Sequence, residues 1–278
     1  MSMTYEDCRT PRPARPTPNV ADNVLRQFKM TDRVCIITGA SRGIGLAVAE
    51  GLAEAGAHVV LVYSSHNRSM NEKASSLAQR HGVKVLNIRC DVTDFEAVRR
   101  LVLRVSEELG KVDVFIANAG TCDPKPILEQ SLDDYHAQIN VNVHGVVHCA
   151  KAVGPVFKKQ GFGNLIITAS ISGSVVTVPI DHTVYNTTKA AVLHLGRSLA
   201  REWRGFARVN MVSPGWIDTE MSNDLPSINE ANRMAVLGRL VLEGHVREMK
   251  GAYLYLASDA SSFVTGAEIT VDGGYTLP

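Results

Sequence analysis

The chain has 278 residues, of which 45% are hydrophobic and 21% are charged, and its formal net charge is +1. Such a composition predicts one large globular domain with a well-filled core. The near-neutral charge points to neither a nucleic acid nor an anionic membrane as partner, and no apolar run approaches the ~18 residues of a membrane-spanning helix. We therefore exclude nucleic-acid-binding and integral membrane proteins.

The first 30 residues differ from the rest of the chain. Residues 12–18 read Arg-Pro-Ala-Arg-Pro-Thr-Pro and show no apolar periodicity. This composition predicts an extended or disordered N-terminal extension, residues 1–30, ahead of a single domain at 31–278. Within the extension, the apolar side chains of residues 24–28 are candidates for docking on the domain or on a neighbouring subunit.

Cysteine and histidine positions give no indication of a metal site. The five cysteines are scattered and contain no Cys-x-x-Cys pair. Cys35 and Cys90 lie in apolar runs, which favours buried free thiols and a reduced, cytoplasmic protein. His144 and His148 share a helix face without a third ligand nearby, so we expect helix packing or a subunit contact.

From residue 34 onward, short apolar runs alternate with helical stretches. Runs rich in Val and Ile predict strands at 34–38, 58–63, 83–90, 112–117, 164–169, 207–212 and 267–271. The segments between them predict helices near 44–55, 70–81, 94–109, 131–159, 184–204 and 245–258. This alternation predicts an α/β fold, a doubly wound (Rossmann-type) parallel sheet of about seven strands in a single domain.

A glycine-rich loop follows the first predicted strand, where a helix begins. Glycines let the backbone turn sharply and approach a pyrophosphate, while the helix N-terminus offers N–H groups. The spacing Gly-x-x-x-Gly-x-Gly differs from the common dinucleotide fingerprint, and a simple tight turn is the alternative. We predict phosphate binding by Gly39, Ser41, Arg42, Gly43, Ile44 and Gly45.

The end of the second predicted strand indicates which dinucleotide is bound. Proteins that prefer NAD usually place an acid there, on the ribose 2′-hydroxyl. Here Tyr63-Ser64-Ser65 contains no acid. Ser64, Ser65 and Arg42 are instead suited to a 2′-phosphate, so we predict NADP(H) rather than NAD(H).

Polar and small residues also follow the third and fourth predicted strands. Ligands bind at the C-terminal strand ends of such sheets. Asp91 is placed to meet an adenine edge, and Gly120 to let the chain pass close to the cofactor. The candidates at these two strand ends are Asp91, Val92, Asn118, Ala119 and Gly120.

Tyr185 and Lys189 are four residues apart in a predicted helix, so both side chains lie on one face. A free tyrosine has a pKa of about 10. A nearby ammonium favours the phenolate, so we expect Lys189 to lower the pKa of Tyr185 toward the working range. A surface pair is the alternative interpretation. His182, three residues earlier, is expected at the surface, with a substrate contact as its alternative.

Taken together, these segments resemble the classical short-chain dehydrogenases/reductases over about residues 30–278. The resemblance rests on residues 38–45, 118–120, 142–145, 170–174, 185–189, 214–215 and 272–274. Within that family, residues 167–173, 206–210 and 272–278 are most similar to fungal NADP-dependent mannitol 2-dehydrogenases, sorbose reductases and yeast carbonyl reductases.

The resemblance implies a role for each motif. Tyr185 would donate a proton to the substrate oxygen, Lys189 would bind the nicotinamide ribose, and Asn142 would position water in a proton relay. A serine would orient the carbonyl: a spacing of 13 before Tyr185 selects Ser172, whereas the distance from Gly173 selects Ser170, which we prefer. Residues 216–240 would cover the substrate, and the cofactor would also contact Pro214, Gly215, Ile217 and Thr219.

The expected activity is NADPH-dependent reduction of a ketone or ketose to a secondary alcohol, reversible as a polyol dehydrogenase of the mannitol/fructose or sorbitol/sorbose type. A reductase of bulkier ketones and a catalytically inactive NADP-binding protein are the alternatives. The family resemblance also implies a homotetramer.

Overall fold

The computed structural model describes residues 20–65, 69–223 and 243–277. Its centre is a seven-stranded sheet in the order β3-β2-β1-β4-β5-β6-β9, with every neighbouring pair parallel. The doubly wound fold predicted from the sequence is confirmed. The strands are β1 (Val34–Thr38), β2 (His58–Tyr63), β3 (Val85–Arg89), β4 (Val114–Ala117), β5 (Asn164–Thr168), β6 (Arg208–Pro214) and β9 (Glu268–Val271).

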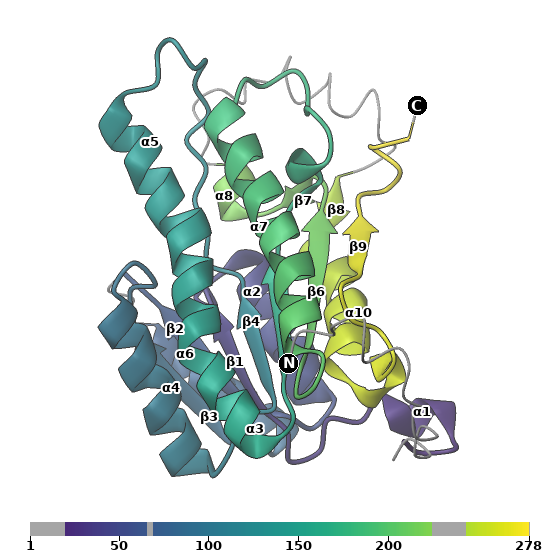
Figure 1. Ribbon diagram of the computed structural model, residues 1–278. Helices are drawn as coiled ribbons and strands as arrows, with labels where there is room; N and C mark the ends of the chain where they lie inside the picture. The colour runs from purple at the N-terminus through teal and green to yellow at the C-terminus, as the bar shows by residue number, and fades with distance from the viewer. Residues whose placement is uncertain (1–19, 66–68, 224–242, 278) are drawn as a thin grey trace, which may run out of the picture.

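Helices cover both faces of the sheet (Figure 1). The side chains of β1 alternate between two cores: Val34 and Ile36 face one, Cys35 and Ile37 the other. The first core is closed by α4 (Phe95–Leu109), α6 (Gly145–Gln160) and α7 (Thr183–Trp203). The second is closed by α2 (Gly43–Glu54), α3 (Met70–His81) and α10 (Val246–Ala257). The sheet is therefore buried on both sides, which explains its apolar runs.

The predicted helix at 131–159 is divided in the structure. It consists of α5 (Leu132–Ile139), a π-helical turn (Asn140–His144) and α6. A 3₁₀ turn, Ile171–Gly173, follows β5, and the short elements β7 (Ile217–Asp218) and α8 (Glu220–Asn223) follow β6. A strand β8 (Gly244–His245) pairs with β7, and a 3₁₀ turn, Asp259–Ser261, follows α10.

Part of the N-terminal extension is helical rather than extended. The side chain of Asn23 accepts hydrogen bonds from the N–H groups of Leu25 and Arg26 and so caps α1 (Val24–Gln27). Phe28 contacts Tyr255 of α10 with ring centroids 6.4 Å apart, and Met30 is buried. Phe28 and Met30 therefore pack on their own domain, whereas Val24 and Leu25 stay exposed, at 60% and 75%, and their docking stays a prediction. Residues 1–19 lie outside the described residues, and the domain boundary at residue 31 stays a prediction.

The predicted packing is confirmed for Cys35, Cys90 and His148, whereas His144 is exposed and bonds through Nδ1 to Asn140 Oδ1 at 2.9 Å. Cys35 and Cys90 are buried and free. His148 donates from Nδ1 to the Val92 carbonyl at 2.9 Å and packs against Phe95 with ring centroids 5.6 Å apart, so it is a packing residue. Across the described ranges, no helix combines the length and hydrophobicity needed to cross a membrane.

Candidate active site

A cavity of about 420 Å³ opens where strands β1 to β6 end. Every cofactor-binding residue predicted from the sequence lines it, which brings together segments more than 170 positions apart. The predicted residues that line it are Gly39, Ser41, Arg42, Gly43, Ile44, Gly45, Tyr63, Ser64, Ser65, Asp91, Val92, Asn118, Ala119, Gly120, Tyr185, Lys189, Pro214, Gly215, Ile217 and Thr219.

The glycine-rich loop leaves room for a large anionic group. Gly43 has a φ of +55°, which side-chain-bearing residues rarely adopt. A Cβ on Gly45 would lie 2.4 Å from the Gly39 carbonyl oxygen, so only glycine fits there. Arg42, the N-cap residue of α2, makes no side-chain capping bond, so its side chain does not occupy the N–H groups of the first helical turn. The loop therefore fits a pyrophosphate.

Hydrogen bonds fix the ends of β1, β4 and β5 relative to one another. Thr38 Oγ1 accepts from the N–H groups of Asn118 and Ala119 at 2.9 and 3.0 Å. Asn118 Nδ2 donates to the Thr38 carbonyl at 2.9 Å, and its Oδ1 accepts from Thr168 Oγ1 at 3.2 Å. These hydrogen bonds hold the three strand ends together at the floor of the cavity.

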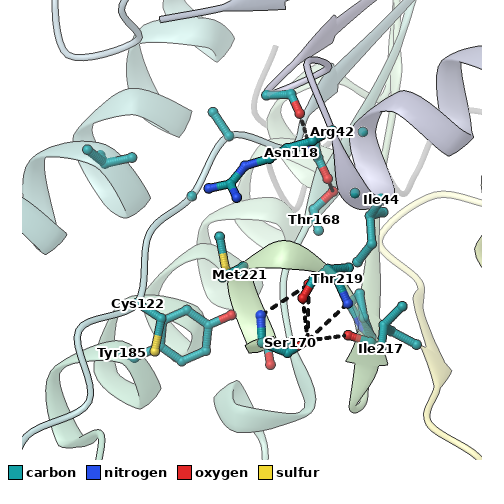
Figure 2. A pocket seen from close by; sticks show the side chains of 18 of the residues that line it. Arg42, Ile44, Asn118, Cys122, Thr168, Ser170, Tyr185, Ile217, Thr219 and Met221 are labelled. Atoms are coloured by element: carbon teal, nitrogen blue, oxygen red, sulfur yellow. Dashed lines mark hydrogen bonds between the residues drawn. The ribbon is translucent and has the colours of Figure 1, made fainter. Parts of the chain in front are cut away.

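The first turns of α7 place Tyr185 and Lys189 at one end of this cavity. Lys189 is only 4% exposed, and its Nζ donates to the Thr168 carbonyl at 3.0 Å. The same Nζ lies over the Tyr185 ring, 5.5 Å from its centroid. Figure 2 shows Tyr185, Cys122 and Ser170 at this end of the cavity.

Burial disfavours the charged form of both residues. It raises the pKa of the Tyr185 phenol, and Cys122 adds to that rise, whereas a side-chain hydrogen bond with Ser170 lowers it. Burial lowers the pKa of Lys189 to about 8. The expectation that Lys189 lowers the pKa of Tyr185 is not met among the described groups. Lys189, with a pKa of about 8, has lost its charge before the pH reaches the raised pKa of the phenol, so it cannot lower that pKa.

The two candidate serines occupy different positions. Ser170 ends the extended segment after β5, and its Oγ accepts from the Ser172 N–H at 3.1 Å. Its hydroxyl also interacts with the Tyr185 phenol, whereas Ser172 enters this hydrogen bond only through its backbone. Both line the cavity, but this geometry favours Ser170 as the partner of Tyr185.

Asn142 is absent from the cavity lining, unlike the other three catalytic candidates. It is buried in the π-helical turn, where Oδ1 accepts from the Thr121 N–H and Nδ2 donates to the Thr121 carbonyl, both at 2.8 Å. Nδ2 also donates to Thr188 Oγ1 at 3.1 Å. The side chain therefore ties the strand-β4 loop to α7, and its relay role stays a prediction.

Several cavity residues were missed or misjudged from the sequence. His182 is buried, not exposed: its Nε2 is hydrogen-bonded to Thr177 Oγ1, and its ring packs 5.5 Å from that of Tyr185. Burial lowers the pKa of His182. Its position three residues before Tyr185, at the N-cap of α7, was the available signal. Cys122 follows a strand-end motif and also lines the cavity.

The predicted substrate cover is described only in part. Trp216, Ile217, Thr219 and Met221 line the cavity. Residues 224–242 of the predicted cover lie outside the described residues. The cavity has the glycine-rich loop at one end and the hydroxyl groups of Ser170 and Tyr185 at the other. The loop suits the pyrophosphate of a dinucleotide, and the hydroxyl groups suit a substrate oxygen on which negative charge develops.

Known proteins similar in sequence to this chain include NADP-dependent oxidoreductases. A profile of the family described as enoyl-(acyl carrier protein) reductase matches residues 39–276. The chain is 45% identical to an NADP-dependent mannitol dehydrogenase of Hypocrea jecorina over 266 residues, covering 94% of this chain and 98% of that one. It is 42% identical to a sorbose reductase of Candida albicans over 266 residues, covering 94% and 93%.

A solved structure agrees with these relatives. The NADPH-dependent 3-quinuclidinone reductase from Rhodotorula rubra has a TM-score of 0.90 and 44% identity to this chain, covering 95% of this chain and 99% of that one. Fold, strand-end motifs and relatives coincide over nearly the whole chain, and the protein belongs to the short-chain dehydrogenase/reductase family.

Proposed function

We propose that this protein uses NADPH to reduce a ketone or ketose to a secondary alcohol, and that the reaction is reversible as a polyol dehydrogenase. The observation that carries the proposal is the joint placement of Ser170, Tyr185 and Lys189 at one end of the cavity whose other end is the glycine-rich loop. A hydrogen-bonding hydroxyl, a phenol and a buried ammonium are suited to receive a carbonyl oxygen as it becomes an alcohol.

Each residue has a separate task in the proposed reaction. Ser170 donates a hydrogen bond that orients the carbonyl, and Tyr185 transfers its phenolic proton to the oxygen. Lys189 holds positive charge beneath them and binds the nicotinamide ribose, while Asn142 supports the relay that returns a proton. Bound NADPH supplies the hydride equivalent.

The choice of NADP(H) rests on the loop after β2. Tyr63, Ser64 and Ser65 line the cavity and bring no acid toward a ribose 2′-hydroxyl. Arg42 lines the same end. The relative from H. jecorina is named as NADP-dependent, which agrees with this choice.

Two neighbours define the substrate alternatives. A mannitol dehydrogenase and a sorbose reductase favour a hydroxylated ketose. The structural neighbour named for 3-quinuclidinone favours a compact, bulky ketone without hydroxyl groups. The ketose is our first choice because two separate relatives support it.

An NADPH-oxidation screen tests the proposal. Fructose, sorbose and xylulose form one arm, and 3-quinuclidinone with simple prochiral ketones forms the other, with NADH as the cofactor control. We expect turnover of at least one ketose with NADPH, and loss of that turnover in Tyr185→Phe. NADPH binding without turnover of any ketone would instead identify a catalytically inactive binding protein.

We also propose a cytoplasmic homotetramer. The segment leading into α5 carries the exposed apolar side chains Ile127, Leu128 and Leu132, with Leu128 97% exposed, which suits burial against another copy. The mass in solution, measured by sedimentation or light scattering, tests the assembly.

A further inference from the structure

Two basic side chains outside the predicted cofactor set hold the loops at the adenosine end of the cavity. Arg89, the last residue of β3, donates from Nε to the Ser64 carbonyl at 2.8 Å. Lys73, in the first turn of α3, donates from Nζ to the Ser41 carbonyl at 2.7 Å. Each therefore anchors the backbone of a residue that lines the cavity where a 2′-phosphate is expected.

The fold brings these two side chains to the same edge of the sheet. Arg89 pairs in register with Tyr63, and the Cys90 N–H donates to the Tyr63 carbonyl at 2.8 Å, so the ends of β2 and β3 are locked together. Asn87 Nδ2 donates to Asn71 Oδ1 at 3.1 Å, which places the start of α3 beside β3.

The two anchoring bonds leave other N–H donors of each side chain available to a phosphate. A guanidinium has five N–H donors and an ammonium has three, and the described contacts use one of each. The carbonyl oxygens of Ser41 and Ser64 would repel a nearby phosphate. Each is instead bonded to a cation, so the same two contacts remove a repulsion and add charge.

Arg89 and Lys73 are not themselves among the residues that line the cavity. We propose that they determine the preference for the 2′-phosphorylated dinucleotide from behind its lining, by holding the Ser64 and Ser41 loops and by adding two positive charges to the backbone that faces the 2′-phosphate. This inference rests on the proposed use of NADP(H). It adds residues from β3 and α3 to a site otherwise composed of the loops after β1 and β2.

Binding of 2′,5′-ADP and 5′-AMP to the full chain, measured by calorimetry, separates a phosphate role from a structural one. The two ligands differ only in the 2′-phosphate. We expect Arg89→Met and Lys73→Met each to lower affinity for 2′,5′-ADP about tenfold while 5′-AMP affinity stays within about twofold. Arg89→Lys keeps the charge and should recover part of the loss. Higher salt should weaken 2′,5′-ADP binding more in the unmodified protein than in Arg89→Met.

Arg99→Met is the matched control. Arg99 is an exposed arginine on α4, paired with Glu96 at 2.8 Å, so the substitution removes the same charge elsewhere. It should leave both affinities unchanged. Equal losses for both ligands, or no loss in Arg89→Met and Lys73→Met, would overturn the inference. If the unmodified protein does not prefer 2′,5′-ADP to 5′-AMP, the proposed NADP(H) preference fails as well.

Discussion

Ser170→Ala against Ser172→Ala decides which serine orients the carbonyl. The two residues are almost equally buried, at 7% and 6% exposure, and they are only two positions apart. They differ in what the hydroxyl does: Ser170 Oγ accepts from the Ser172 N–H and bonds to Tyr185, whereas the described contacts of Ser172 here involve its backbone. Burial therefore cannot explain a difference between the two variants.

The structure gives the expected sizes. Removing a hydrogen-bond donor from a developing oxyanion lowers kcat about 100-fold, which is the loss we expect for Ser170→Ala. That variant also loses a cap of the 3₁₀ turn, which should cost about 1 kcal/mol of unfolding free energy. Ser172→Ala should change kcat by no more than about threefold.

The assay is steady-state reduction of the best ketose from the screen, with NADPH saturating, together with thermal unfolding of each variant. The melting temperature of Ser170→Ala should fall by only about 2–4 °C, so the loss of kcat cannot be attributed to unfolding. A Ser170→Ala enzyme within about threefold of the parent, or a larger loss in Ser172→Ala, would refute the assignment.

Two further predictions concern the glycine loop and pH. Gly45→Ala should weaken NADPH binding about tenfold or more, because its Cβ would lie 2.4 Å from the Gly39 carbonyl oxygen; Gly251→Ala, on α10 with open space around it, should leave binding intact. For pH, Lys189 with a pKa of about 8 is charged below that value, so kcat/KM for reduction should fall as pH rises through about 8. A profile flat to pH 10, or normal NADPH binding by Gly45→Ala, would contradict these expectations.

The sheet and the cofactor end of the site could be predicted from the sequence because both depend on local patterns. All seven main strands lie within two residues of their predicted bounds. For the central strands the reason is that strands buried on both faces are continuously apolar, whereas the edge strands β3 and β9 are only partly buried. The C-terminal ends of parallel strands meet at one edge, so motifs at those ends converge without any knowledge of side-chain positions. Gly39, Asp91 and Asn118 are examples.

The features that the sequence did not predict depend on contacts between distant segments. The helix at residues 24–27 exists because Asn23 caps it and Phe28 packs on Tyr255, more than 220 positions away. His182 is buried by its bond to Thr177 within a segment that has no periodic pattern. Arg89 and Lys73 act through backbone carbonyls, which a sequence motif does not display.

The raised pKa of Tyr185 bears on the direction of the reaction. A buried phenol remains protonated at neutral pH and is a weak acid, yet an alkoxide is far more basic than a phenolate, so proton transfer to the reduced carbonyl is still favourable. Alcohol oxidation needs the phenolate, which burial disfavours and which only the Ser170 hydrogen bond supports among the described groups. The cavity by itself therefore favours reduction near neutral pH, and oxidation should accelerate as pH rises. Lys189 contributes positive charge only while it is protonated, below a pH of about 8. As pH rises, the rate of reduction should therefore fall while the rate of oxidation increases.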